Sequence, residues 1–153
     1  MMLYQDREDT VAQFSKVMGH PIDLKDWDEK TLEFRYRLIV EEVKELGEEI
    51  AYAMAESHFK AGVPDKVKAR LLKELADVQY VLSGFAVTFG LPLQVAFNRV
   101  HASNMTKLGE DGKPVYRSDG KVLKGPNYRS PEMEDLFEKD FIDMDFDGGF
   151  LHE

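Results

Sequence analysis

The feature that most constrains this fold is a pair of long segments in which apolar residues recur at alternating spacings of four and three. One segment runs from residue 32 to 53 and the other from 71 to 89, with Gly62 and Pro64 between them. Such spacing lines up the apolar side chains along one stripe of a helix that packs lengthwise on its neighbours. The stripe residues are Leu32, Tyr36, Ile39, Val43, Leu46, Ile50 and Ala53, then Leu71, Leu75, Val78, Leu82, Phe85 and Phe89.

Two shorter helices are expected on either side of this long pair. Residues 7–19 carry apolar residues at helical spacing. Asp28 is a suitable N-cap for the first long helix, in which Gly47 is the weak point. Pro92 suits the first turn of a fourth helix that ends by Gly109. The prediction is an all-α, four-helix-bundle fold.

Chain length and charge distribution indicate how the rest of the chain is organised. The 153 residues suit a single domain, with a helical core at about 7–108, a basic loop segment at 109–130 and an acidic tail at 131–153. The tail holds nine acids and one lysine, whereas residues 103–130 hold six basic and three acidic residues. Two Asp-Gly dipeptides in the basic segment predict a small hairpin over 115–124.

The composition limits the cellular compartment, the binding partners and the metal ligands that can be expected for this protein. There is no cysteine, so any metal must be held by oxygen or histidine. No run of about 18 apolar residues exists, and the first nine residues lack the apolar stretch of a secretory signal. The net charge of -9 argues against a general nucleic-acid surface. We therefore expect a cytoplasmic protein that binds neither membrane nor nucleic acid.

Two pairs of acids stand at the same position relative to the apolar stripes. Glu42 and Glu45 each precede a stripe residue of the first long helix, and Glu74 and Asp77 each precede one in the second. Residues three apart share a helix face, so the four carboxylates can converge on one pocket. Repulsion among them favours a hard divalent cation, Mg²⁺ or its substitute Mn²⁺. Spacing alone leaves a metal site and a solvated acidic surface both open.

A di-iron centre is a rival use of helical carboxylates, and it needs Glu-x-x-His motifs. None of the four histidines has a glutamate three residues before it. Di-iron chemistry is therefore disfavoured.

The acidic motifs resemble those of a known family. The run Glu41-Glu42-Val43-Lys44-Glu45 followed by Glu74-Leu75-Ala76-Asp77 is similar to the E-E-x-x-E and E-x-x-D signature of MazG-like, all-α NTP pyrophosphohydrolases, in the phosphoribosyl-ATP pyrophosphohydrolase-like superfamily. Segments 101–107 and 121–128 resemble those that follow the metal helices in phage and bacterial members. The resemblance covers roughly residues 32–131, and it implies Mg²⁺-dependent cleavage of a (d)NTP to a (d)NMP and pyrophosphate.

The same resemblance implies roles for individual residues. The metal ligands would be Glu42, Glu45, Glu74 and Asp77, and Glu41 would be a catalytic carboxylate that bridges metal or activates water. Which glutamate is the general base stays open. The substrate-binding residues would be Asn104, Lys107, Arg117, Lys124 and Tyr128, the last three with a solvated loop as an equal alternative. A homodimer or a dimer of dimers is also implied.

Two alternatives to an NTP pyrophosphohydrolase remain. A phosphoribosyl-ATP pyrophosphohydrolase or an all-α dUTPase would use the same fold, metal and mechanism on another substrate. A non-catalytic helical dimerisation or interaction protein would use the acidic surface to bind a basic partner. That second reading gives no reason for carboxylates at matched positions on two helices.

Overall fold

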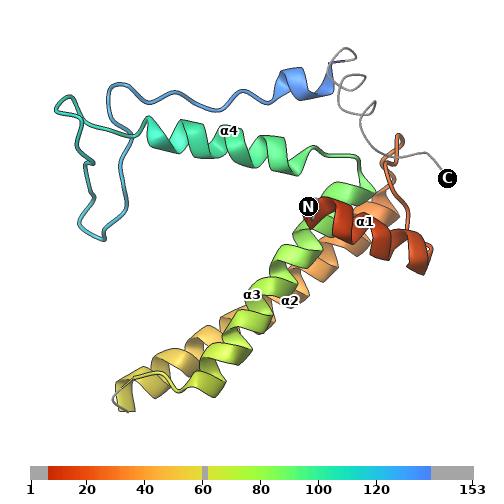
Figure 1. The fold of residues 1–153 in the computed structure, drawn as a ribbon, viewed down its shortest axis with the longest axis horizontal. Helices are drawn as coiled ribbons and strands as arrows, with labels where there is room; N and C mark the ends of the chain where they lie inside the picture. The colour runs from red at the N-terminus through yellow and green to blue at the C-terminus, as the bar shows by residue number, and fades with distance from the viewer. Residues whose placement is uncertain (1–6, 60–61, 139–153) are drawn as a thin grey trace, which may run out of the picture. The chain divides into compact units, whose positions relative to one another are not determined.

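The computed structural model describes residues 7–59 and 62–138, and every regular element within them is a helix. The chain divides into two compact units between Leu91 and Pro92. The first unit contains α1 (Arg7–Met18), α2 (Glu29–Phe59) and α3 (Asp65–Thr88), and the second contains α4 (Leu93–Met105) and the 3-10 helix η1 (Glu134–Phe137) (Figure 1). The all-α prediction is confirmed. That the two units act as a single domain stays a prediction, and tail residues 139–153 lie outside the described residues.

Asp28 starts α2 in the way its sequence position predicts. The Thr31 N–H donates to Asp28 Oδ1 at 2.9 Å, and the Thr31 hydroxyl donates to Oδ2 at 2.7 Å. These two bonds hold the pKa of the Asp28 carboxyl below its usual range. The cap satisfies an N–H group that the first turn of the helix leaves without a partner.

Gly47 lies on the exposed side of α2, and a Cβ built there meets no heavy atom within 4 Å. Replacing Gly47 with alanine is therefore expected to raise the free energy of unfolding by about 0.5–1 kcal/mol, because alanine loses less backbone entropy in a helix. Urea denaturation followed by circular dichroism measures this. Gly112→Ala is the contrasting variant: its φ of +71° disfavours a side chain, and it should destabilise. A destabilised Gly47→Ala would contradict the open environment.

The first unit is built on α3. Helices α2 and α3 run side by side along their length, and α1 packs against α3 (Figure 1). Small buried residues stand on α1 and α3, including Ser15, Ser83 and Thr88. The Thr88 hydroxyl donates to the Gly84 carbonyl at 2.8 Å, so this polar side chain is satisfied inside the helix. Small side chains at these positions allow the helices to approach closely.

The connection from α1 to α2 closes the carboxyl end of α3. Its backbone N–H groups at Asp23 and Leu24 donate to the carbonyls of Val87 and Thr88 at 3.0 and 2.9 Å. Gly90 has a φ of +61°, and a Cβ there would lie 3.1 Å from Asp23 Oδ1. The positive φ therefore favours glycine where α3 ends, and a side chain there would also press on Asp23.

Much of the predicted apolar stripe is exposed in a single chain. Ala53 and Phe89 are buried, but many of the other stripe residues are exposed, among them Tyr36, Val43, Ile50, Leu75 and Leu82. The α2–α3 contact thus covers part of the stripe. Within the described residues, no single helix is long and apolar enough to cross a membrane, although Asp65–Phe89 and Leu93–Met105 reach that measure when taken together.

In the second unit, the chain returns alongside α4 (Figure 1). Arg99 Nη2 donates to Asp135 Oδ2 at 2.7 Å, and the Ser103 hydroxyl donates to the Arg129 carbonyl at 2.6 Å. Leu136 of η1 is buried. The ion pair with Asp135 and the bond that Arg99 Nη1 donates to the Glu132 carbonyl at 2.9 Å therefore fix the beginning of the acidic tail to α4, and the Ser103 bond fixes the end of the basic segment to it.

The predicted hairpin in the basic segment forms with a single antiparallel bridge, between Tyr116 and Val122. The Arg117 N–H donates to the Lys121 carbonyl at 2.8 Å, and the Leu123 N–H donates to the Val115 carbonyl at 2.7 Å. No extended strand accompanies this bridge in the described part of the chain. The Asp-Gly turn thus reverses the chain as predicted.

Candidate metal centre

Three carboxylates from two helices converge in the first unit. Glu42 and Glu45 of α2 and Glu74 of α3 each offer one oxygen, and these oxygens all lie within 4.8 Å of one another. Each residue precedes a stripe position, so when α2 and α3 pack along the stripe the two pairs of acids come to the same flank. The shared position in the sequence predicts this convergence. Their role as metal ligands stays a prediction.

Asp77 and Glu41 lie at the margin of this cluster. Asp77 Oδ2 is 2.8 Å from Lys73 Nζ. Burial raises the pKa of Glu42 most, the negative charge of Asp77 raises it further, and the charge of Glu41 has a smaller effect in the same direction. Glu41 is exposed on α2. Asp77 therefore lies beside the cluster and is paired with Lys73. Glu41 precedes Glu42 in α2 and is exposed to solvent.

Burial makes the cluster electrostatically unfavourable without a cation. Burial raises the pKa of the Glu42 carboxyl, the charges of Asp77 and Glu45 raise it further, and Lys73 opposes them. Glu74 is 8% exposed, and its Oε2 is buried without a hydrogen-bond partner. A buried carboxylate oxygen without a donor is costly, and all-oxygen groups suit hard divalent cations. The residues therefore fit a divalent metal.

Asn104 and Lys107 of the second unit were predicted to bind substrate. Asn104 lies in the last turn of α4, and Lys107 follows the helix end at Met105. The Lys107 N–H donates to the Asn104 carbonyl at 3.1 Å, which continues the turn beyond the helix. The two side chains thus start from a single rigid turn, as their spacing predicts.

The other three predicted substrate-binding residues already have partners in the chain. Arg117 Nε donates to Asp119 Oδ1 at 2.9 Å. The Lys124 ammonium lies 4.3 Å from the centre of the Tyr128 ring. Hydrogen bonds with the Ser130 and Ser103 hydroxyls, aided by Lys124, lower the pKa of Tyr128 to about 8. Any contact of these residues with a nucleotide therefore requires an exchange of partners.

Two charged residues near the helix contacts were missed by the sequence analysis. Lys73 is one residue before Glu74 and four before Asp77, a helix spacing that would have indicated the ion pair with Asp77. Arg35 is 6% exposed, with Nε and Nη2 lacking partners, and burial lowers its pKa. It stands seven residues before Glu42, on the same face of α2, and its Nη1 lies 3.5 Å from where a Cβ on Gly84 would stand.

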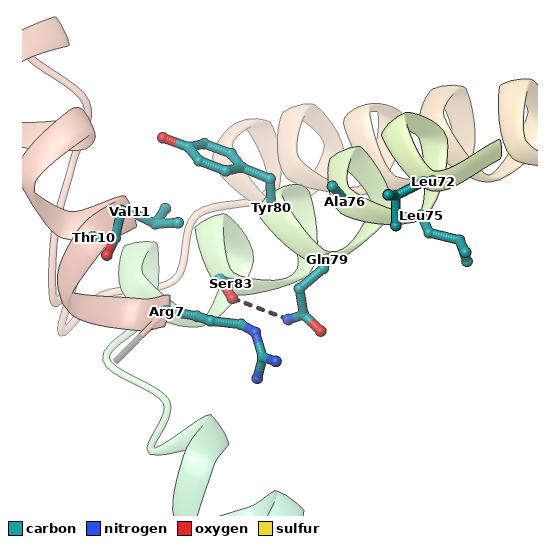
Figure 2. Close-up of a pocket in the computed structure, with 9 residues that line it drawn as sticks. All are labelled: Arg7, Thr10, Val11, Leu72, Leu75, Ala76, Gln79, Tyr80 and Ser83. Atoms are coloured by element: carbon teal, nitrogen blue, oxygen red, sulfur yellow. Dashed lines mark hydrogen bonds between the residues drawn. The ribbon is translucent and has the colours of Figure 1, made fainter. Parts of the chain in front are cut away.

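A pocket of about 420 Å³ lies between α1 and α3 (Figure 2). Its lining is mainly apolar, with Val11, Leu72 and Leu75 among the residues that form it. Figure 2 shows the Arg7 side chain extending toward the Gln79 amide, which donates to the Ser83 hydroxyl at 3.2 Å. None of the four predicted metal ligands lines this pocket. The pocket and the candidate metal centre are therefore lined by different residues, although Leu75 and Ala76 of the pocket stand between Glu74 and Asp77 in the sequence.

Fold and site together define an all-α protein with a cluster of carboxylates on a long helix pair. The family model described as phosphoribosyl-ATP pyrophosphohydrolase matches residues 11–104. The chain belongs to this family of pyrophosphohydrolases, which act on nucleotide-like substrates, and the predicted MazG-like membership is confirmed. None of the curated proteins compared with the chain matches it. The matched range ends at Asn104, so Lys107, Arg117, Lys124 and Tyr128 lie beyond it.

Proposed function

We propose that the protein is a magnesium-dependent nucleoside triphosphate pyrophosphohydrolase that converts a (d)NTP to a (d)NMP and pyrophosphate, with Mn²⁺ as a possible substitute. The observation that carries this proposal is the convergence of Glu42, Glu45 and Glu74, whose oxygens lie within 4.8 Å in a chain of the pyrophosphohydrolase family. The buried Oε2 of Glu74 also supports the proposal, because it has no hydrogen-bond partner and a bound cation would compensate its charge.

In this proposal Glu42, Glu45, Glu74 and Asp77 hold the metal. The chemistry that a divalent ion held by these residues would supply is neutralisation of phosphoryl charge and activation of water. Glu41, exposed beside Glu42, is the proposed catalytic carboxylate, and one of the clustered glutamates accepts the proton of the attacking water. Water attacks phosphorus directly, so no covalent intermediate forms on the enzyme.

In this proposal, residues of the second unit bind the substrate. Asn104 and Lys107 bind sugar and phosphate, and Arg117 and Lys124 exchange their present partners for phosphate oxygens, with Tyr128 stacking on the base. A homodimer or dimer of dimers would cover the exposed apolar residues of α2 and α3. We further propose that the protein works in the cytoplasm.

The family description supports a second substrate, phosphoribosyl-ATP, with the same chemistry. An all-α dUTPase is a further variant of the same reaction. A purely structural interaction protein is the less favoured alternative, because the chain belongs to a family of pyrophosphohydrolases and the buried Glu74 oxygen favours a bound cation.

A substrate panel tests the proposal. The protein is incubated with NTPs, dNTPs and phosphoribosyl-ATP, with Mg²⁺ or with EDTA, and monophosphate and pyrophosphate are quantified. We expect Mg²⁺-dependent release of both products in equal amounts from at least one NTP or dNTP. Turnover of phosphoribosyl-ATP alone would support the second substrate. Release of orthophosphate, or turnover undiminished in EDTA, would overturn the mechanism.

A further inference from the structure

Lys73 places a positive charge within the carboxylate cluster. Its Nζ is 2.8 Å from Asp77 Oδ2 and 3.1 Å from Glu74 Oε1, so one ammonium joins two of the four proposed ligands. Part of the negative charge that a metal would neutralise is therefore already neutralised by the chain itself.

The neighbouring cation on α3 is held differently. Arg70 Nε donates to both oxygens of Glu49, at 3.0 and 3.1 Å, and its guanidinium lies 5.0 Å from the centre of the Tyr52 ring. Lys73 instead has a side chain that is 63% exposed, on a flexible four-carbon stem. Lys73 can therefore swing into solvent without movement of the helix.

We propose that Lys73 is an exchangeable counter-ion of the metal site: its ammonium holds Glu74 and Asp77 in the metal-free protein and leaves them when a divalent ion binds. This inference rests on the proposed function. The ammonium and the metal compete for the same carboxylate oxygens, and two cations that close to each other repel. The doubly charged ion gains more from the cluster, so it displaces the lysine. The cost of that displacement lowers the affinity for metal.

The test measures metal binding directly. Calorimetric titration of MgCl₂ and of MnCl₂ into the metal-free protein compares the wild type with Lys73→Met, Lys73→Arg and Lys68→Met. Lys68 is the matched control, because its side chain is also 63% exposed and pairs with an acid of α3, Asp65, at 2.9 Å. Its replacement changes net charge equally but outside the cluster.

We expect Lys73→Met to bind both metals roughly 5- to 10-fold more tightly than Lys68→Met, a difference of about 1–1.4 kcal/mol. Lys73→Arg keeps the charge and should remain within about twofold of the wild type. In EDTA, Lys73→Met should melt at a lower temperature than Lys68→Met, because the carboxylates lose their counter-ion. Lys73→Gln serves in place of Lys73→Met if circular dichroism shows that the methionine variant is not helical.

Equal or weaker metal binding by Lys73→Met than by Lys68→Met would overturn the exchange. In that case a wild type that still binds metal leaves the proposed function standing. A wild type that binds neither metal at millimolar concentration would instead overturn both the exchange and the metal site beneath it. The two failures are therefore distinguished by the wild-type titration.

Discussion

Replacing Glu74 with glutamine is expected to abolish pyrophosphate release while making the metal-free protein harder to unfold. Glu74 is the most buried carboxylate of the cluster, and its Oε2 has no donor. Glutamine keeps the shape and removes one of the clustered negative charges, while Lys73 keeps Asp77 as its partner, so the free energy of unfolding should rise by about 1 kcal/mol. It also removes an anionic metal ligand, so kcat/KM with Mg²⁺ should fall by at least about 100-fold.

Steady-state kinetics and urea denaturation in EDTA measure the two effects of Glu74→Gln. Glu48→Gln is the matched control, since Glu48 lies on α2 outside the cluster and its exposed side chain is 3.8 Å from Lys44. Such an exposed pair contributes little, so the control should stay within about 0.5 kcal/mol of the wild type and keep its activity. A Glu74→Gln enzyme with nearly full turnover would remove Glu74 from the ligand set. A Glu74→Gln variant with a lower free energy of unfolding than the wild type would show that other groups of the folded protein already compensate the charge of Glu74.

The convergence of the carboxylates could be predicted because it follows from periodicity. A spacing of three places Glu42 beside Glu45, and their common relation to the apolar stripes brings Glu74 to the same flank once α2 and α3 pack. The Asp28 cap is similarly local, since it depends on residues within one turn. Features fixed by neighbours within four residues, or by a stripe shared between helices, can be read from sequence.

Features that depend on which side chains meet across the fold could not be predicted in this way. Arg35 of α2 is buried, and its Nη1 lies near Gly84 of α3, a contact that the pattern of α2 alone does not contain. The pairing of Arg117 with Asp119 is local, but nothing in the basic segment says whether Arg117 prefers an internal acid or a phosphate. The choice of substrate also depends on loop residues that follow no sequence periodicity, so it could not be predicted from the sequence either.

Replacing Gly125 with alanine is expected to disrupt the second unit without affecting the metal site of the first. A Cβ on Gly125 would collide with the carbonyl oxygen of Leu108 and come within 3.1 Å of the Gly109 nitrogen. These are backbone atoms at the point where two chain segments cross beyond α4 (Figure 1), so no side-chain rotation relieves the clash. We expect a loss of about 2–4 kcal/mol in the local free energy of opening.

Hydrogen exchange of the amides in residues 106–129 measures that loss in the Gly125→Ala variant. Gly120→Ala is the control that distinguishes a steric clash from backbone strain. Gly120 has a φ of +86°, but a Cβ built there meets no heavy atom within 4 Å, so the substitution should lower the free energy of local opening by about 1–2 kcal/mol. If the basic segment binds nucleotide as proposed, Gly125→Ala should raise KM while calorimetry finds the Mg²⁺ affinity unchanged. Weakened Mg²⁺ binding in this variant would mean that the second unit contributes to the metal site itself.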